Sequence, residues 1–188
     1  MQNTTQYRDS PNRYGIVSRC LHWLMTLVFL WQFGSAIVHL LAKDTPLDEF
    51  MWGLHKSVGT LLMLLIVLRI LWAIVNAGRR PPSVSGWARS GHMALYALML
   101  LIPLVALIRQ YGSGKAFAPF GLPFMPGFEG NKVEWMTDLG SNFHSLMAWI
   151  LLAMIVGHIA AALWHRAQGH KDVYHRMIGG TTANRRAI

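Results

Sequence analysis

Residues 141–165 read SNFHSLMAWILLAMIVGHIAAALWH and contain no aspartate, glutamate, lysine or arginine. As an α-helix, a stretch of this length crosses the hydrocarbon core of a bilayer, which takes about 20 residues. Lipid cannot satisfy an open backbone, and the stretch is too long for a strand of a barrel. It is therefore predicted to be a transmembrane helix, and its two histidines, His144 and His158, are central to the interpretation of the rest of the chain.

Three further apolar stretches are long enough to cross a membrane. They run from about Ser18 to Leu41, from about Met51 to Val75, and from about Ser90 to Arg109, the last with Pro103 as an expected kink. The sequence predicts an all-α membrane protein, a four-transmembrane-helix bundle that forms a single domain over residues 1–188. The expected helices span about 18–41, 51–75, 90–109 and 141–165.

The net charge of +9 on the 188 residues follows the predicted topology. One side of the bundle carries Arg8, Arg13, Arg19, Arg69, Arg79, Arg80, Arg89, Arg166, Lys171, Arg176, Arg185 and Arg186. The other side carries only Lys43, Lys56, Arg109, Lys115 and Lys132. Because basic residues are retained in cytoplasmic loops, both termini are predicted to be cytoplasmic. This distribution along span ends, rather than in one patch, argues against nucleic-acid binding.

The longest loop, over residues 110–140, lies on the predicted outer side. Its segment 116–128 reads AFAPFGLPFMPGF, with four phenylalanines among prolines and glycines. Long loops in compact domains are usually functional or disordered, and this composition favours an ordered cap over the outer end of the bundle.

Histidines inside membrane spans are costly and usually functional. His144 and His158 are 14 residues apart, which is about 21 Å along a helix and within roughly 40° of one face. His22 begins the first span on the inner side, level with His158. His55 begins the second span on the outer side, level with His144. The topology thus predicts two bis-histidine pairs, His22 with His158 and His55 with His144.

Paired imidazoles in the core of a helical bundle favour haem iron as the bound metal. Zinc is disfavoured because each pair lacks the further ligands of a tetrahedral site. The single cysteine, Cys20, excludes a Cys-x-x-Cys-His attachment site, so non-covalent b-type haem is expected. For any one histidine alone, an interfacial side chain bonded to a neighbour is the alternative.

Two further histidines bear on the pairing. His92, near the start of the third span, is the main rival ligand at the inner level. His39 is 17 residues past His22 in the first helix, which is not a whole number of turns, so it points to a different face.

Gly59 and Arg69 are the other candidate haem-binding residues. Gly59 lies one turn beyond His55 and would leave room for a flat macrocycle, although ordinary small-residue helix packing explains it equally well. Arg69 follows His55 at the same spacing at which His158 follows His144, which puts it at the depth of the inner pair. It would either bind a haem propionate through paired hydrogen bonds or extend to the inner headgroups.

These residues together resemble the bacterial cytochrome b561 family, which is related to the cytochrome b subunits of hydrogenases and formate dehydrogenases. The resemblance rests on His22-Trp23, on His55-x-Ser57-x-Gly59, on Gly91-His92, on Phe120–Leu122, and on the spacing of His144 and His158 in the fourth span. It covers the chain from Tyr14 to about Met177.

The resemblance implies the same two haem pairs, with His92 not a ligand, in a multi-pass protein of the bacterial inner membrane. It also implies electron exchange with a quinone and, for some members, oxidation of superoxide at the outer face. The segment Tyr111–Lys115 departs from the superoxide-oxidising type.

The leading hypothesis is therefore an oxidoreductase or electron-transfer protein in which two b-type haems exchange electrons with membrane quinone. Lys56, Arg109, Lys115 and Lys132 either form a positive outer mouth that steers an anion such as superoxide, or only solvate the loops. An alternative is a haem-bearing membrane anchor subunit for a soluble or periplasmic redox partner. A transporter or scaffold without haem is a third, but no inverted repeat supports it.

Overall fold

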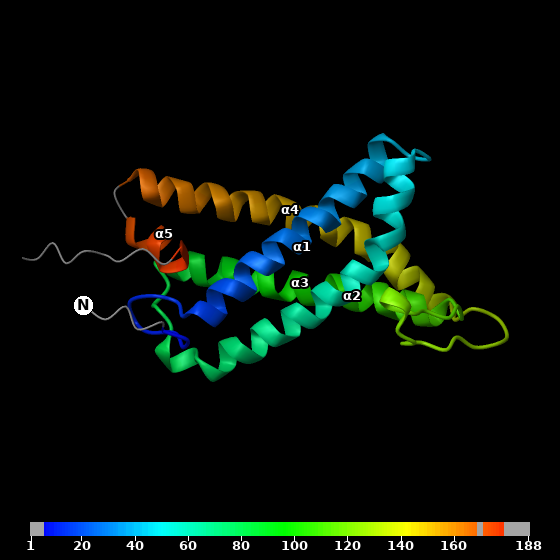
Figure 1. The fold of residues 1–188 in the computed structure, drawn as a ribbon, viewed down its shortest axis with the longest axis horizontal. Coiled ribbons are helices and arrows are strands. Elements are labelled where there is room, and N and C mark those ends of the chain that lie inside the picture. Colours follow the sequence, from blue (N-terminus) through cyan, green and yellow to red (C-terminus); the bar gives the residue numbers. More distant parts are fainter. Residues whose placement is uncertain (1–5, 169–170, 179–188) are drawn as a thin grey trace, which may run out of the picture.

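Four long helices make up most of the computed structural model, which describes residues 6–168 and 171–178. They are α1 (Ile16–Leu41), α2 (Pro46–Val75), α3 (Gly86–Gly112) and α4 (Glu134–Ala167). All four are long and apolar enough to cross a membrane. The short helices η1 (Ala77–Arg79), η2 (Pro119–Gly121) and α5 (Lys171–Ile178) lie in or after the connections (Figure 1). No β-strand occurs in the described residues, so the predicted all-α four-span fold is confirmed.

The helices extend beyond the predicted spans, mainly at their N-termini. α2 begins at Pro46 because the Thr45 hydroxyl accepts the Asp48 N–H at 3.3 Å, and α3 begins after Ser85, whose hydroxyl accepts the Ala88 N–H at 3.1 Å. α4 begins at Glu134, well before the predicted start at 141. Hydropathy marks only the part of a helix that lies in lipid, whereas these polar first turns continue the helix into water.

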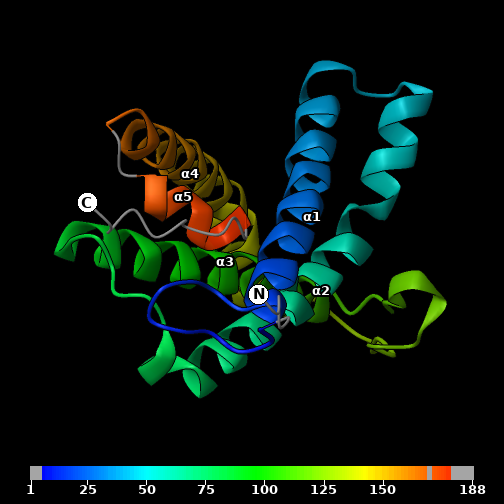
Figure 2. The same ribbon diagram turned by 60° about the vertical axis from the view of Figure 1, so that its left-hand side comes forward.

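The helices pack as two antiparallel pairs, α1 with α2 and α3 with α4, and α2 also contacts α3. The buried core, Met25, Val28, Leu62, Leu65 and Ile66, lies between α1 and α2 and is covered by Met99 and Leu100 of α3. Figure 2 shows the α1–α2 pair leaning away from the α3–α4 pair toward the turn that joins α1 to α2. The two pairs therefore diverge in the half of the bundle that contains this turn.

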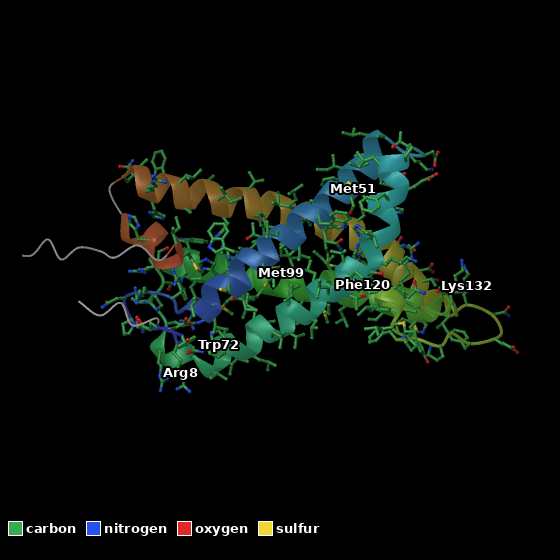
Figure 3. All side chains as sticks on the ribbon, viewed as in Figure 1. Arg8, Met51, Trp72, Met99, Phe120 and Lys132 are labelled. Carbon is green, nitrogen blue, oxygen red and sulfur yellow. The ribbon has the colours of Figure 1, made fainter. Side chains whose placement is uncertain are left out.

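The segments before α1 and after α4 meet at one end of the bundle. The Arg19 guanidinium donates to the Ile178 carbonyl at 3.1 Å, and the Tyr14 N–H donates to the Arg176 carbonyl at 3.3 Å. Buried Asp9 accepts from Arg80 at 3.1 Å and ties the N-terminal segment to the α2–α3 connection. Figure 3 labels Arg8 at this end and Lys132 at the opposite end, in agreement with four crossings.

The outer loop is folded, but it covers the bundle only in part. Phe117 pairs with Met125 in an isolated bridge, and the Phe128 N–H donates to the Gly114 carbonyl at 3.0 Å. Gly127 has φ 81°, and a β-carbon there would collide with the Gly114 carbonyl, so the loop needs glycine at this point. The side chains of Phe120 and Phe124 at the tip are exposed rather than packed on the helices.

The charge pattern predicts which end faces the cytoplasm, and cysteine labelling tests it. In a Cys20→Ser background, Lys132→Cys should react with a membrane-impermeant maleimide added to intact spheroplasts. Arg79→Cys, exposed at the opposite end, should react only after permeabilisation. Labelling of Arg79→Cys but not Lys132→Cys in intact spheroplasts would reverse the orientation.

Candidate haem and electron-transfer site

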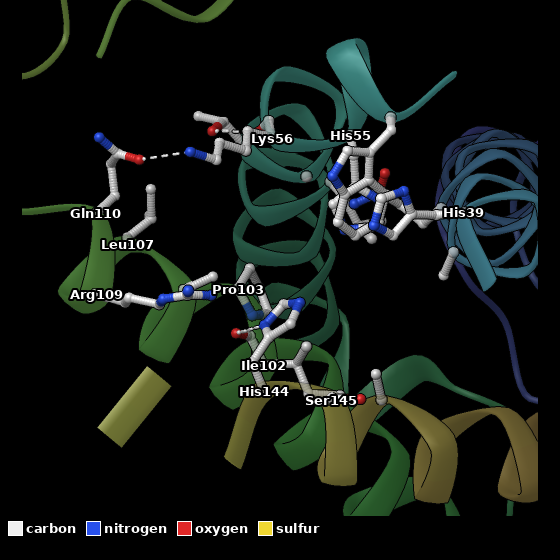
Figure 4. Close-up of a pocket in the computed structure, with 18 of the residues that line it drawn as sticks. His39, His55, Lys56, Ile102, Pro103, Leu107, Arg109, Gln110, His144 and Ser145 are labelled. Atoms are coloured by element: carbon white, nitrogen blue, oxygen red, sulfur yellow. Dashed lines mark hydrogen bonds between the residues drawn. The ribbon is translucent and has the colours of Figure 1, made fainter. Parts of the chain in front are cut away.

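A cavity of about 1100 Å³ lies between the two helix pairs in their diverging half. All four long helices contribute to its wall, and Phe117 of the outer loop adds to it. The volume exceeds the roughly 300–1,000 Å³ of a typical small-molecule site. Figure 4 shows the cavity with His55 of α2 on one side and His144 of α4 on the other.

His55 and His144 face each other across this cavity, with ring centres 6.4 Å apart and ring planes at 80°. The Ser35 hydroxyl donates to the Gln32 carbonyl at 2.8 Å and lies 2.7 Å from His55 Nδ1, so His55 must donate to Ser35 through an Nδ1–H. His144 Nδ1 is 3.1 Å from the Ile102 carbonyl, which can only accept (Figure 4). Both rings therefore carry their proton on Nδ1 and keep the Nε2 lone pair for a metal.

The cavity wall beside His55 contains Gly59, the small residue expected there from the sequence. Gly59 lines the cavity one turn along α2. A β-carbon at Gly59 would come within 2.9 Å of the Gln32 amide nitrogen across the α1–α2 contact. The Gln32 amide oxygen is buried and has no hydrogen-bond partner in the described structure. Gly59 thus serves close helix packing and cavity space at the same position.

His39 also lines this cavity. Its Nδ1 is 2.9 Å from a carboxylate oxygen of Asp48, whose side chain is 6% exposed. The indole of Trp52 stacks parallel to the His39 ring, with ring centres 4.0 Å apart, and its centre is 4.6 Å from that of the His55 ring. His39, Trp52 and His55 therefore form a continuous series of ring contacts.

The cavity is electropositive. Lys43, Lys56, Arg109 and Lys115 line it, and no aspartate or glutamate among the described residues does. Lys56 donates to the Gln110 side chain at 3.1 Å, and that amide donates to the Lys115 carbonyl at 3.1 Å, which ties α2, α3 and the loop together. Three of the four predicted mouth residues are thus on the cavity wall, whereas Lys132 is exposed elsewhere on the loop.

Three histidines lie near one another in the other half of the bundle. The His158 and His92 rings are 5.3 Å apart at 71°. The predicted partner of His158, His22, interacts electrostatically with both of them but makes its ring contact with Trp23. The structure thus gathers the predicted pair and its rival at one level of the bundle.

Arg69 is buried beside this inner group, with 9% of its surface exposed. It donates to the Tyr96 hydroxyl at 3.1 Å and to the Ser18 carbonyl at 3.1 Å, both neutral groups. Within the described ranges no carboxylate lies in ion-pair distance of Arg69. A buried guanidinium with only neutral partners has capacity for an anion.

Comparison with known proteins shows the family to which the chain belongs. Residues 13–180 match the sequence model of prokaryotic cytochrome b561. The chain belongs to the prokaryotic cytochrome b561 family. It is 30% identical to cytochrome b561 homolog 2 of Escherichia coli (strain K12) over 185 residues, 95% of this chain and 97% of that protein. It is also 26% identical to the probable superoxide oxidase CybB of Yersinia pestis over 158 residues, 81% of this chain and 88% of that one.

Membership makes the chain a multi-pass bacterial membrane cytochrome that carries electrons on b-type haem, and the outer cavity fits such a group. Metal–imidazole bonds of about 2 Å put two axial rings roughly 6 Å apart at their centres, close to the 6.4 Å between His55 and His144. Each ring also has the second hydrogen bond that orients a metal-binding histidine. When bound, haem supplies the one-electron chemistry, while the protein supplies ligation, burial and charge.

Some residues of this site were not recognised as functional from sequence. The sequence does not indicate the role of Ser35, because its hydrogen bond to His55 depends on the α1–α2 packing. Asp48 belongs to no recognisable sequence motif. Its position shortly after His39, across a short turn, is the one signal that could have suggested the contact.

Proposed function

We propose that this cytochrome holds two b-type haems, one in each half of the bundle, and exchanges electrons with membrane quinone. The outer haem is bound by His55 and His144 and the inner haem by His22 and His158. The observation that carries the proposal is the His55–His144 geometry, a pair of rings whose Nδ1 atoms both have hydrogen-bond partners, across a cavity large enough for a macrocycle. The spacing of His144 and His158 along α4 extends the same logic to the inner level.

His22 is the preferred inner partner of His158. The 5.3 Å between the His92 and His158 ring centres is shorter than the roughly 6 Å that an iron between two imidazoles requires. His92 is therefore better placed to pack against His158 than to share a metal with it. The propionates of an inner haem would supply the anion that Arg69 lacks among its protein partners.

Superoxide is a second candidate substrate. A cavity lined by Lys43, Lys56, Arg109 and Lys115, without acidic residues in its described wall, attracts small anions toward His55 and His144. One relative carries the name probable superoxide oxidase. The alternative role as a haem-bearing membrane anchor subunit predicts a soluble redox partner that copurifies in constant ratio.

Haem stoichiometry tests the proposal. The purified protein should contain two haems per chain by pyridine haemochrome assay, both extractable with acid acetone. His55→Ala or His144→Ala should remove one haem and His22→Ala or His158→Ala the other, because each pair shares one depth. His92→Ala should retain both. A ratio of one in the wild-type protein, or loss of haem in His92→Ala but not in His22→Ala, would refute the assignment.

The Ser35 hydrogen bond should tune the outer haem. Accepting the Nδ1–H makes the His55 imidazole more basic, which stabilises the oxidised iron. Ser35→Ala should therefore raise the midpoint potential of the outer haem by roughly tens of millivolts, with both haems retained. Ser18→Ala, an equally buried serine on the same helix, is the matched control and should leave the outer haem unchanged. An unchanged outer potential in Ser35→Ala would show that the hydrogen bond has no electronic effect.

Arg69 should tune the inner haem in the opposite direction. Removal of a buried positive charge disfavours the reduced state, so Arg69→Leu should lower the inner midpoint potential. The expected shift is on the order of 70 mV, taking about 10 Å to the iron and an effective dielectric of about 20. Arg69→Lys keeps the charge and should shift the potential less. Redox titration that finds both potentials unaltered in Arg69→Leu would exclude a propionate contact.

A further inference from the structure

His39, near the end of α1, and Asp48, near the start of α2, form a histidine–aspartate dyad across the turn between the two helices. One oxygen of Asp48 is 2.9 Å from His39 Nδ1, and the other accepts the Asp44 N–H at 3.0 Å. Asp44 has φ 63°, in the left-handed region that few non-glycine residues adopt, so the turn is bent around this carboxylate. With Asp48 accepting from both sides, His39 carries its proton on Nδ1 and its lone pair on Nε2.

This dyad belongs to the same cavity as His55 and His144. His39 lines the wall and is held flat against Trp52, which in turn contacts His55. Gly53, next to Trp52, also lines the cavity, and a β-carbon there would meet no atom within 4 Å. The cavity therefore brings together open space beside Gly53, the oriented imidazole of His39 and the outer histidine pair. The volume of about 1100 Å³ leaves room for a substrate ring beside a haem.

We propose that His39, oriented by Asp48, is the proton-exchanging residue of a quinol site at the outer haem. This rests on the proposed quinone exchange and assigns it to the outer half of the bundle. A quinol needs an electron acceptor and a proton acceptor at one place, and the cavity offers both. Asp48 is a positioning residue, because it sets the protonation and orientation of His39 without reaching the cavity wall.

The chemistry balances with these groups. A quinol loses two electrons and two protons to become a quinone. Each haem iron would take one electron, so the two proposed haems together would accept both electrons, and each proton would pass from a quinol hydroxyl to His39 Nε2 and then to the outer solvent before the next transfer. Superoxide, in contrast, gives up one electron and leaves as dioxygen with no proton to transfer. His39 is therefore needed for a quinol donor and dispensable for superoxide.

Stopped-flow haem reduction in detergent-solubilised holoprotein tests the assignment, with a short-chain quinol, superoxide and dithionite as separate donors. His39→Gln should slow reduction by the quinol roughly 100-fold, and Asp48→Asn should slow it less. Dithionite and superoxide, which transfer no proton, should reduce both variants without the loss of rate seen with the quinol. Glu49→Gln, an exposed acid in the same turn of α2, is the charge-matched control for Asp48→Asn.

Binding provides a readout that is independent of turnover. Calorimetric titration of the dithionite-reduced protein with the short-chain quinol, which that protein cannot oxidise, should show roughly fivefold weaker binding in His39→Phe, from loss of the hydrogen bond that the quinol hydroxyl donates to His39 Nε2. Gly53→Leu, which fills the open space beside Trp52, should weaken binding even if the His39 variants fold poorly.

Wild-type quinol rates in His39→Gln, or unaltered quinol binding in both His39→Phe and Gly53→Leu, would overturn the outer quinol site while leaving quinone exchange elsewhere intact. A wild-type protein that the quinol cannot reduce, and that does not pass electrons to the quinone after reduction by dithionite, would overturn the proposed quinone exchange itself.

Discussion

Lipid cannot solvate an imidazole, so each histidine inside a span must find its partner at its own depth. A helix rises by a constant step per residue, which converts sequence spacing into depth. The spacing of His144 and His158 therefore places them at two different depths along α4. Another helix can provide a partner for either one only if it has a histidine at the same depth. The antiparallel packing of α1 with α2 and of α3 with α4 brings His55 to the outer level and His22 and His92 to the inner one.

The two halves of the bundle meet this constraint differently. In the outer half the helix pairs diverge, His55 and His144 face each other across open space, and their Nδ1 atoms are engaged by Ser35 and the Ile102 carbonyl. In the inner half the helices pack around the buried cluster that contains Met25, Leu65 and Ile66, and Arg69 is held by Tyr96 and Ser18. The outer half thus has a cavity lined by its histidine pair, while the inner half has a buried guanidinium beside its histidines.

Hydropathy and helical spacing were enough to predict four helices, their order and the depth of each histidine, because these depend on one helix at a time. Helix ends were predicted less well, since Thr45 and Ser85 cap turns that lie outside lipid. The contacts of Ser35 and His39 depend on how α1 rotates against α2 and on the left-handed backbone of Asp44, which no single-helix pattern encodes. The choice between His22 and His92 likewise depends on the rotation of α3 against α4.

The proposed function requires a haem at each of two depths along α4, one at His144 and one at His158. Crystallographic anomalous scattering at the iron edge measures this most directly, because it locates iron without assuming a ligand. We expect two iron peaks per chain, separated by roughly 20 Å along α4, one beside His144 and one beside His158. A single iron peak, or two peaks in the same half of the bundle, would contradict it.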